Sequence, residues 1–242
     1  MSKPTSQRAA TRVARNIVDD IKERALPPGS RLESEQVMVE SQGVARATVR
    51  EALRLLEFQG ALRIKAGPGG GPVVNVPGVD HLTSALSLQL QFANASFQAV
   101  LEARRAIYPV LVAEAAQNAN HQDIARLRHA LTQVRNAIEN SGSAIAEYRH
   151  FYEQIAVAAQ NLVLGLLVNA LHRMSESANV KYDQAHWQAS VIESERLLDA
   201  IEQGDVDAAR TISTQSVNAA MRYQKKTAPE QLRAPLAWVA AD

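Results

Sequence analysis

The chain has 242 residues, a net charge of +1 and an apolar fraction of 46%, and it contains no cysteine. The apolar fraction supplies a hydrophobic core and excludes wholesale disorder. The lack of cysteine excludes disulfides, thiolate metal sites, iron–sulfur clusters and a cysteine nucleophile. No apolar run is long enough to cross a bilayer, and the N-terminus lacks the apolar stretch of a secretory signal. We therefore expect a cytoplasmic protein that does not bind membranes.

Charge, glycine and proline divide the chain into two parts. Residues 1–78 carry 12 Lys and Arg against 8 Asp and Glu, whereas residues 79–242 carry 14 against 17. Eight of the eleven glycines and six of the nine prolines also lie in the first part. Helix breakers are scarce in the second part, which is expected to be almost entirely helical. We predict one domain over residues 8–77, a second over 80–227 and a tail over 228–242.

The first part has the pattern of three helices followed by a β-hairpin. Ser34 is a candidate N-cap for the second helix, and Gly43 is placed to make a tight turn before the third. A glycine-rich loop joins the two short strand candidates. The predicted elements are a helix around residues 13–21, a helix over 34–41, a helix over 45–59, and strands over 62–65 and 73–76.

The predicted third helix carries arginines along one side. Arg46, Arg50 and Arg54 follow one another at intervals of four residues, so they lie on one stripe. Two short helices joined by a glycine turn, the second with such a stripe, are typical of a helix-turn-helix. In the major groove, arginine binds guanine or phosphate, and Thr48 is placed to bind phosphate or a base edge. The alternative is a solvated helix face whose three arginines have no common role.

The second part has apolar residues at helical spacing throughout. This pattern predicts an antiparallel α-helical bundle, so the whole chain is expected to be mainly α. The segment 161–182 is apolar over a broad face and is expected to be central. A further helix over residues 80–92 is expected to bridge the two domains. The remaining predicted helices are 96–119, 123–140, 143–159, 186–203 and 205–224.

Polar residues interrupt the apolar faces of these helices. A buried arginine is costly unless it is paired, and buried hydroxyls need hydrogen-bond partners. If these groups converge, they line a cavity for a small molecule. The alternative is that each hydroxyl bonds a nearby backbone carbonyl and that the arginine meets an acid. The six candidates are Arg104, Tyr108, Tyr148, Tyr152, Ser194 and Ser216.

The stretch from Leu26 to Val74 resembles the winged helix-turn-helix of the GntR superfamily of bacterial regulators. The matching pieces are PGSRL at residues 28–32, the Ser34–Glu35 pair, RATVREAL at 46–53 and LEFQGAL at 56–62. The helical remainder resembles the ligand-binding domain of the FadR subgroup. The resemblance therefore implies a winged helix-turn-helix of three helices and a small β-hairpin, followed by a helical effector-binding and dimerisation domain.

The resemblance also implies which residues contact DNA. Arg46, Thr48 and Arg50 occupy positions that contact the operator in that family, and the wing glycine that matches Gly67 approaches it. Gln36 stands where the family often has a DNA-contacting arginine, so it is a candidate contact with altered chemistry. Ala45 stands where a serine usually caps the recognition helix, and such a loss costs about 0.5–2 kcal/mol.

In the helical domain the resemblance implies a pocket without a metal. Many members of the family hold a metal ion with one aspartate and three histidines. When this chain is aligned with the family on its FYEQIAVAAQN and LLDAIEQGD stretches, the four ligand positions fall on residues that do not suit a divalent ion. Those positions are Tyr148, Tyr152, Ser194 and Ser216. Tyr108 replaces a frequent glutamate, while Arg104 keeps the basic residue of the family. His150 stays open as a substitute ligand, and no cofactor is expected.

Together these features predict a ligand-responsive transcriptional repressor. Two chains are expected to form a homodimer that binds an inverted repeat in double-stranded DNA. A small-molecule effector, either a carboxylic acid or an acyl-thioester, is expected to pair with Arg104. The alternative is a constitutive DNA-binding regulator whose pocket is vestigial. An enzyme is not expected, because the chain lacks a GxSxG, an HExxH and a P-loop motif, and Glu147 and Glu153 point in different directions on their helix.

Overall fold

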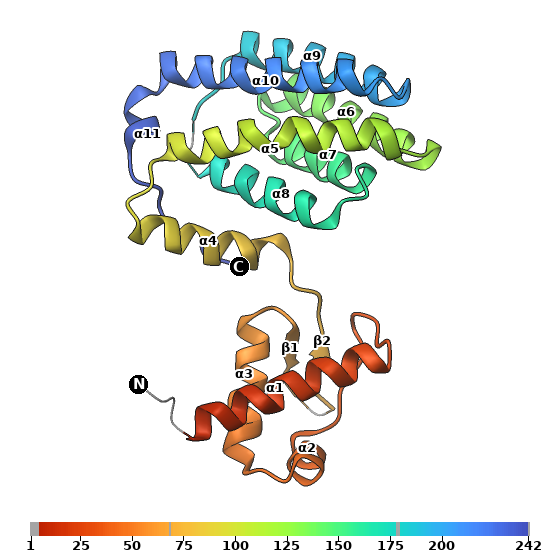
Figure 1. Cartoon of the computed structure of the whole chain (residues 1–242), viewed down its shortest axis with the longest axis vertical. Coiled ribbons are helices and arrows are strands. Elements are labelled where there is room, and N and C mark those ends of the chain that lie inside the picture. Colours follow the sequence, from red (N-terminus) through yellow and green to blue (C-terminus); the bar gives the residue numbers. More distant parts are fainter. Residues whose placement is uncertain (1–4, 68, 178–179, 242) are drawn as a thin grey trace. The chain divides into compact units, whose positions relative to one another are not determined.

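The computed structural model of the chain describes residues 5–67, 69–177 and 180–241. It divides into two compact units, the first ending at His81 and the second beginning at Leu82. The division falls three residues inside a helix, α4, which spans Val79–Phe92. Figure 1 labels the elements of both units, and each unit is described by itself below.

The first unit is a small three-helix domain with a hairpin. Helix α1 packs against α3, α2 also packs against α3, and the two strands are antiparallel, with Leu62 opposite Val74. The core that joins them contains Val13, Met38, Val49 and other apolar residues of these helices and strands. The elements are α1 (Thr5–Glu23), α2 (Glu35–Gln42), α3 (Arg46–Phe58), β1 (Leu62–Lys65) and β2 (Gly71–Val74).

Local chemistry sets the turn between α2 and α3. The Ser34 hydroxyl accepts a hydrogen bond from the backbone N–H of Val37 and caps α2 as predicted. Gly43 ends α2 with φ of 60°, in the left-handed region that glycine adopts without steric cost. Ala45 precedes α3 and offers no side-chain cap. The turn is therefore fixed by the cap of one helix and the glycine, while the first N–H groups of α3 are left for other acceptors.

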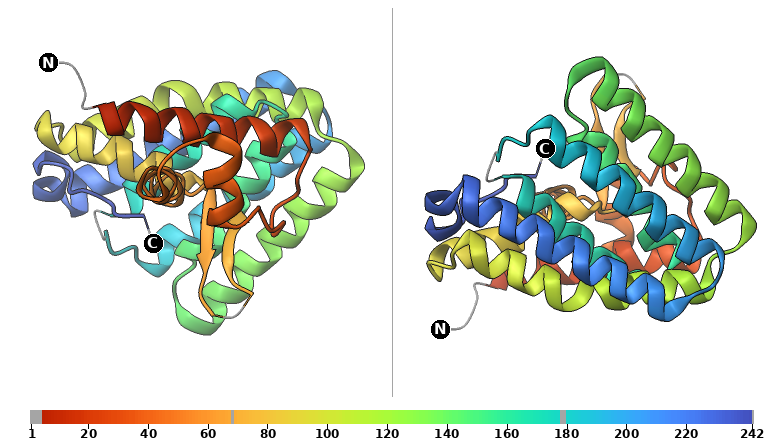
Figure 2. Two further views of the ribbon diagram at one scale, coloured as in Figure 1. Left: turned by 90° about the horizontal axis from the view of Figure 1, so that it is seen from below. Right: turned by 90° about the horizontal axis from the view of Figure 1, so that it is seen from above.

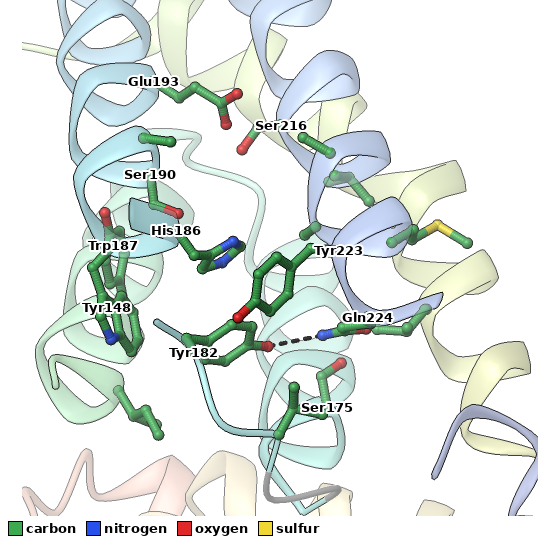
Figure 3. Close-up of a pocket in the computed structure, with 18 of the residues that line it drawn as sticks. Tyr148, Ser175, Tyr182, His186, Trp187, Ser190, Glu193, Ser216, Tyr223 and Gln224 are labelled. Carbon is green, nitrogen blue, oxygen red and sulfur yellow. Dashed lines mark hydrogen bonds between the residues drawn. The ribbon is translucent and has the colours of Figure 1, made fainter. Parts of the chain in front are cut away.

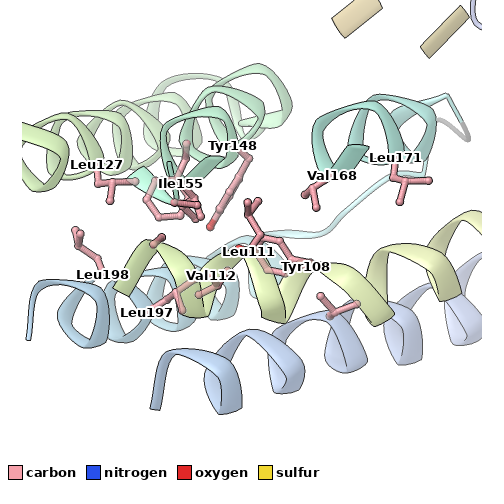
Figure 4. Packing of buried hydrophobic residues seen from close by; sticks show 14 of the residues in the cluster. Tyr108, Leu111, Val112, Leu127, Tyr148, Ile155, Val168, Leu171, Leu197 and Leu198 are labelled. Atoms are coloured by element: carbon pink, nitrogen blue, oxygen red, sulfur yellow. The ribbon is translucent and has the colours of Figure 1, made fainter. Parts of the chain in front are cut away.

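The second unit is an antiparallel helical bundle built around α5. Helix α5 packs against α7, α8, α9 and α10, and it runs beside α10 in both Figure 1 and Figure 2. Figure 4 shows side chains of α5, α6, α7, α8 and α9 meeting in one apolar core. The further elements are α5 (Phe97–Asn118), α6 (His121–Ser141), α7 (Ile145–Ala158), α8 (Leu162–Glu176), α9 (Gln184–Glu202), α10 (Val206–Thr227) and α11 (Pro229–Arg233).

Helix α8 differs from the expectation that it is central. It ends at Glu176 rather than near residue 182, and residues 178 and 179 lie outside the described part. Its inner face is buried, with Gly165 against Ala156 of α7, but four apolar residues near its N-terminus are exposed. These four are Leu162, Val163, Leu166 and Leu167. The apolar face is broad because α8 has two apolar sides, and only one of them meets the core.

The described part of the segment expected as a tail, residues 228–241, packs on the helical bundle. It begins as α11, and Leu232 and Leu236 are buried in the bundle core. The backbone N–H of Leu236 donates to the Ala95 carbonyl at 2.9 Å. The Trp238 indole Nε1 donates to the Ser84 hydroxyl at 2.9 Å. Two prolines made the segment look like a tail, whereas its apolar residues anchor it to α4 and α5.

The segment after α11 should contribute measurably to stability. Replacing the buried Leu236 by alanine removes packed methyl groups and leaves a cavity, so we expect Leu236→Ala to lower the free energy of unfolding by about 2–4 kcal/mol. Urea denaturation followed by circular dichroism measures this change. The matched control is Gln231→Ala in α11, whose side chain is exposed. Equal effects of the two substitutions would contradict the packing of this segment.

Candidate functional site

The exposed side of α3 presents the residues that the sequence assigned to DNA. Arg46 and Arg50 are exposed and Thr48 is partly exposed, whereas Val49 between them is completely buried. Burial of Val49 against the core of the first unit fixes the rotation of the helix, and this rotation turns the arginines outward. Gln36 is exposed on α2, where its amide donates to Glu40 at 3.4 Å.

An ion pair that the sequence did not indicate holds one of these arginines. Arg50 Nε donates to Glu35 Oε2 at 2.8 Å, between α3 and the first turn of α2. The two side chains are 57% and 37% exposed, and such pairs are worth about 0–1 kcal/mol. The pair is therefore weak enough for a phosphate to replace the carboxylate, while it keeps the guanidinium near the junction of the two helices.

The loop between β1 and β2 allows close backbone approach. Gly67 is exposed and has φ of 93°, and its carbonyl accepts a hydrogen bond from Gly70. A Cβ at Gly70 would lie 2.2 Å from the Lys65 carbonyl oxygen, so only glycine fits there. The guanidinium of Arg31 lies beside Gly69 of the same loop. Sequence reasoning included Arg31 in the PGSRL match but gave it no role.

The second unit contains a cavity of about 400 Å³ between α5, α7, α8, α9 and α10. Five of the six predicted effector residues line it. The sixth, Tyr108, lies behind the wall, completely buried in the core, with its ring 5.5 Å from that of Tyr152. The five that line the cavity are Arg104, Tyr148, Tyr152, Ser194 and Ser216.

Aromatic rings form much of the cavity wall (Figure 3). Tyr148 stacks on Trp187 with ring centroids 5.7 Å apart, and Trp187 meets the edge of Tyr182 at 5.2 Å. Tyr182 and Tyr223 lie 5.6 Å apart. Figure 3 also shows the hydrogen bond from Gln224 to the hydroxyl of Tyr182, which measures 2.8 Å. The rings come from α7, α9, α10 and the segment before α9, so folding alone brings them together.

Arg104 lies against two tyrosine rings and has no acidic partner in the described part of the chain. Its guanidinium carbon is 5.1 Å from the ring centroid of Tyr152 and 5.7 Å from that of Tyr108. In the described part of the chain no carboxylate forms an ion pair with Arg104, and its Nε has no hydrogen-bond partner. Cation–π contacts compensate part of the cost of removing a guanidinium from water.

Burial changes the ionisation of the groups around Arg104. Burial, with the nearby arginines 104, 149 and 173, holds the pKa of His172 well below its usual value. Burial also raises the pKa of Tyr148 and, more strongly, that of Tyr108. The imidazole and both phenols are therefore neutral at pH 7, and Arg104 is a positive charge among neutral rings.

Several cavity residues were not found from the sequence. His172, Tyr182, His186, Trp187, Tyr223 and Gln224 all line the cavity. The ring centroids of His172 and Tyr152 are 4.4 Å apart. The sequence suggested His150 as the histidine beside the pocket, whereas the structure places His172 there. His150 is instead half-exposed beside Glu153. Tyr182 and Trp187 flank the start of α9. The cluster of aromatic residues there was the sequence feature that could have indicated these cavity residues.

The four positions at which the family resemblance places metal ligands carry no metal-binding side chains here. Tyr148, Tyr152, Ser194 and Ser216 offer phenol and alcohol oxygens rather than imidazole or carboxylate. Across the described ranges, no group of three or more His, Cys, Asp or Glu side chains is arranged to hold a metal ion. The residues at this site therefore do not fit a divalent metal.

Two family models match the chain. Residues 9–71 match the model of bacterial regulatory proteins of the gntR family, and residues 99–219 match the FCD domain. The chain belongs to the GntR family. It is a DNA-binding transcriptional regulator with a gntR helix-turn-helix and a helical FCD domain, and it is not an enzyme. In the described residues no helix is long and apolar enough to span a membrane.

Curated relatives are regulators of the same kind. An uncharacterized HTH-type transcriptional regulator of Mycobacterium tuberculosis is 31% identical over 68% of this chain and 67% of its own length. The regulator LutR of Bacillus subtilis is 30% identical over 62% of this chain and 67% of its own. The Exu regulon transcriptional regulator of Escherichia coli is 29% identical over 66% of this chain and 62% of its own.

A solved structure shares the fold of this GntR-family chain. The GntR protein of Streptococcus agalactiae superposes with a TM-score of 0.70 at 18% identity, covering 88% of this chain and 99% of that one. The match supports the arrangement of a winged helix-turn-helix followed by a helical bundle.

The neutral His172 makes stability depend on pH. In the unfolded chain the imidazole takes up a proton near pH 6.5, whereas in the folded chain it stays neutral to lower pH. The unfolded state then binds more protons, so the free energy of unfolding should fall as the pH is lowered from about 7.5 to 5.5, by up to about 1.4 kcal/mol per pH unit for this group.

Urea denaturation of His172→Gln and of the wild type at both pH values isolates this contribution. The variant should lose less stability on acidification. His129→Gln, which replaces an exposed histidine, serves as the control and should follow the wild type. An unchanged pH dependence in His172→Gln would show that His172 titrates alike in the folded and unfolded chain, which contradicts the lowered pKa.

Proposed function

We propose that this regulator is a repressor whose affinity for its operator is set by a small-molecule effector in the cavity of the FCD domain. The observation that carries the proposal is the cavity of about 400 Å³, lined by Arg104 and a wall of rings. A volume of this size matches the pockets that bind small molecules. A vestigial pocket would be expected to fill with side chains, and the buried polar atoms of Arg104, His172 and Gln224 would find partners.

The DNA-binding step is assigned to α3 and the hairpin loop. Arg46, Thr48 and Arg50 lie in the first two turns of α3 and are at least partly exposed, beside the buried face of the helix. A recognition helix contacts base edges in the major groove with its N-terminal residues. Gly67 and Arg31 place open backbone and a positive charge at the hairpin, where the DNA backbone or minor groove passes. Gln36 contributes a neutral amide, which hydrogen bonds but adds no charge.

The dimer is assigned to the exposed side of α8. Leu162, Val163, Leu166 and Leu167 form one apolar patch on this helix, and exposed patches of this kind mark protein–protein contacts. A two-fold axis through such a patch is self-complementary, since each copy offers the same surface. A homodimer of this kind presents two copies of α3 to the half-sites of an inverted repeat.

Ligand and DNA affect each other through the arrangement of the dimer. If the effector favours an arrangement that does not match the operator spacing, ligand and DNA must oppose each other by the same coupling free energy, about 1–3 kcal/mol. The unliganded dimer then occupies the operator and blocks transcription, and the effector releases it.

The role of α3 is tested with a duplex that the wild-type chain selects from a random DNA pool. Arg50→Ala should weaken binding about tenfold or more and should lower the steepness of the salt dependence by about one counterion. Electrophoretic mobility shift over a range of salt concentrations measures both quantities. Arg105→Ala, which removes an exposed arginine of α5, is the control. Unchanged binding by Arg50→Ala would remove this residue from the DNA contact.

The role of the α8 patch is tested by sedimentation. Leu166→Glu puts a charge in the centre of the proposed interface and should convert the dimer to a monomer in analytical ultracentrifugation, because two carboxylates would be desolvated across the two-fold axis. Ile192→Glu, at an exposed apolar position of α9, should leave the dimer intact. A dimer that survives Leu166→Glu would place the interface elsewhere.

A further inference from the structure

We propose that the effector is an aromatic carboxylate, with its carboxylate on Arg104 and its ring against the aromatic wall of the cavity. This inference rests on the proposed function, because it takes the cavity to be the effector site. It narrows the ligand from any carboxylic acid or acyl-thioester to a planar ring that carries an anionic group.

The concentration of rings favours an aromatic body. The chain has five tyrosines and two tryptophans. Four of the tyrosines line the cavity, and the fifth, Tyr108, packs against the lining residue Tyr152. Trp187 and the imidazoles of His172 and His186 complete the wall. Ring–ring contacts contribute about 0.5–1.5 kcal/mol beyond the burial of area, so a wall of this kind discriminates a flat ring from a saturated one.

Arg104 favours an anion. Its guanidinium lies over Tyr152, and no acid in the described ranges neutralises it. A planar guanidinium accepts a carboxylate through two parallel hydrogen bonds, which makes this pairing stronger than one with a neutral group. The ring of Tyr152 holds Arg104 from one side and thereby limits the directions from which a ligand reaches it.

Acidic residues of the lining do not turn the site into a receptor for cations. Glu176 is bound to Arg149 through Nε and Nη2, with the shortest distance 2.6 Å. The Asp183 carboxylate caps α9 by accepting from the His186 backbone N–H at 2.8 Å. Glu193 lies beside Ser216, at the opposite end of the cavity from Tyr182 and Gln224 in Figure 3. Glu176 and Asp183 are therefore engaged by groups of the chain itself, and a cation would meet the charge of Arg104.

Two further buried polar atoms fit substituents on the ring. The Gln224 amide donates to the Tyr182 hydroxyl, so its orientation is set, and its Oε1 has no donor in the described chain. His172 Nδ1 is likewise unpaired there. A hydroxyl or N–H group on the ligand would supply the donor that Gln224 lacks, and unpaired buried groups are costly enough to select such a ligand.

The class of ligand is tested by isothermal titration calorimetry on the full chain with three matched probes. These are 2-naphthoate, the saturated decahydronaphthalene-2-carboxylate, and the neutral 2-naphthamide. We expect 2-naphthoate to bind about tenfold or more tightly than either of the others. In a Trp238→Phe background Trp187 is the remaining tryptophan, and 2-naphthoate should also quench its fluorescence.

Variants assign the two parts of the ligand to residues. Arg104→Met keeps the length of the side chain and should reduce the affinity for 2-naphthoate about tenfold while leaving 2-naphthamide unchanged. Arg105→Met, on the exposed side of the same helix, should bind all probes as the wild type does. Tyr182→Leu should bring the affinities for 2-naphthoate and its saturated counterpart together. Circular dichroism establishes that each variant is folded.

The possible outcomes are distinct. Equal affinity for the saturated acid would overturn the aromatic part, and tighter binding of the amide would overturn the anionic part. If 2-naphthoate, benzoate and cinnamate all fail to bind, the class is wrong. DNA binding is measured separately, so a ligand that binds without changing the mobility shift would leave the ligand class standing and refute the proposed sensing function.

Discussion

Burial of α5 is the constraint on which the second unit depends. This helix packs against α7, α8, α9 and α10, so its residues have few alternatives to the core. Arg104 stands one turn before Tyr108, whose ring is completely buried. Fixing α5 by Tyr108 therefore places the partly buried guanidinium of Arg104 at the cavity, where an unpaired charge is costly. The faces of Tyr108 and Tyr152 reduce that cost without neutralising the charge. The interior keeps a positive site that an anion can complete.

Tyrosine and serine occupy the positions at which the family resemblance places metal ligands, so the cavity offers rings and hydroxyls there. Here the positive charge belongs to a side chain, and Tyr148 and Tyr152 contribute ring faces instead of metal–ligand bonds. Binding of the proposed effector would then depend on shape and on ring contacts in addition to charge. Neutral His172, held so by burial and by neighbouring arginines, adds hydrogen bonding without a competing charge.

The cavity wall on α10 and the segment that bonds α4 are close along the chain. Tyr223 and Gln224 line the cavity near the end of α10, and α11 follows directly. The segment after α11 then bonds α4 through Gln91, Ser84 and Ser87. Packing of Leu232 and Leu236 holds this segment in the core. A compact connection of this kind accounts for the order in a stretch that sequence composition alone suggested was a tail.

Sequence pattern determined the identity of nearly every helix, the turn at Gly43 and the outward arginines of α3, because these depend on periodicity, capping and glycine within a few residues. It also indicated Arg104, Tyr148 and Tyr152 as polar interruptions of apolar faces. Only the tertiary structure placed Tyr108 behind the wall and exposed one side of α8, since an apolar pattern does not say which neighbour covers it. Folding alone brought Tyr182, Trp187 and Tyr223 into the wall of the cavity that Arg104 also lines. Their distances along the chain carry no information about which helices pack together.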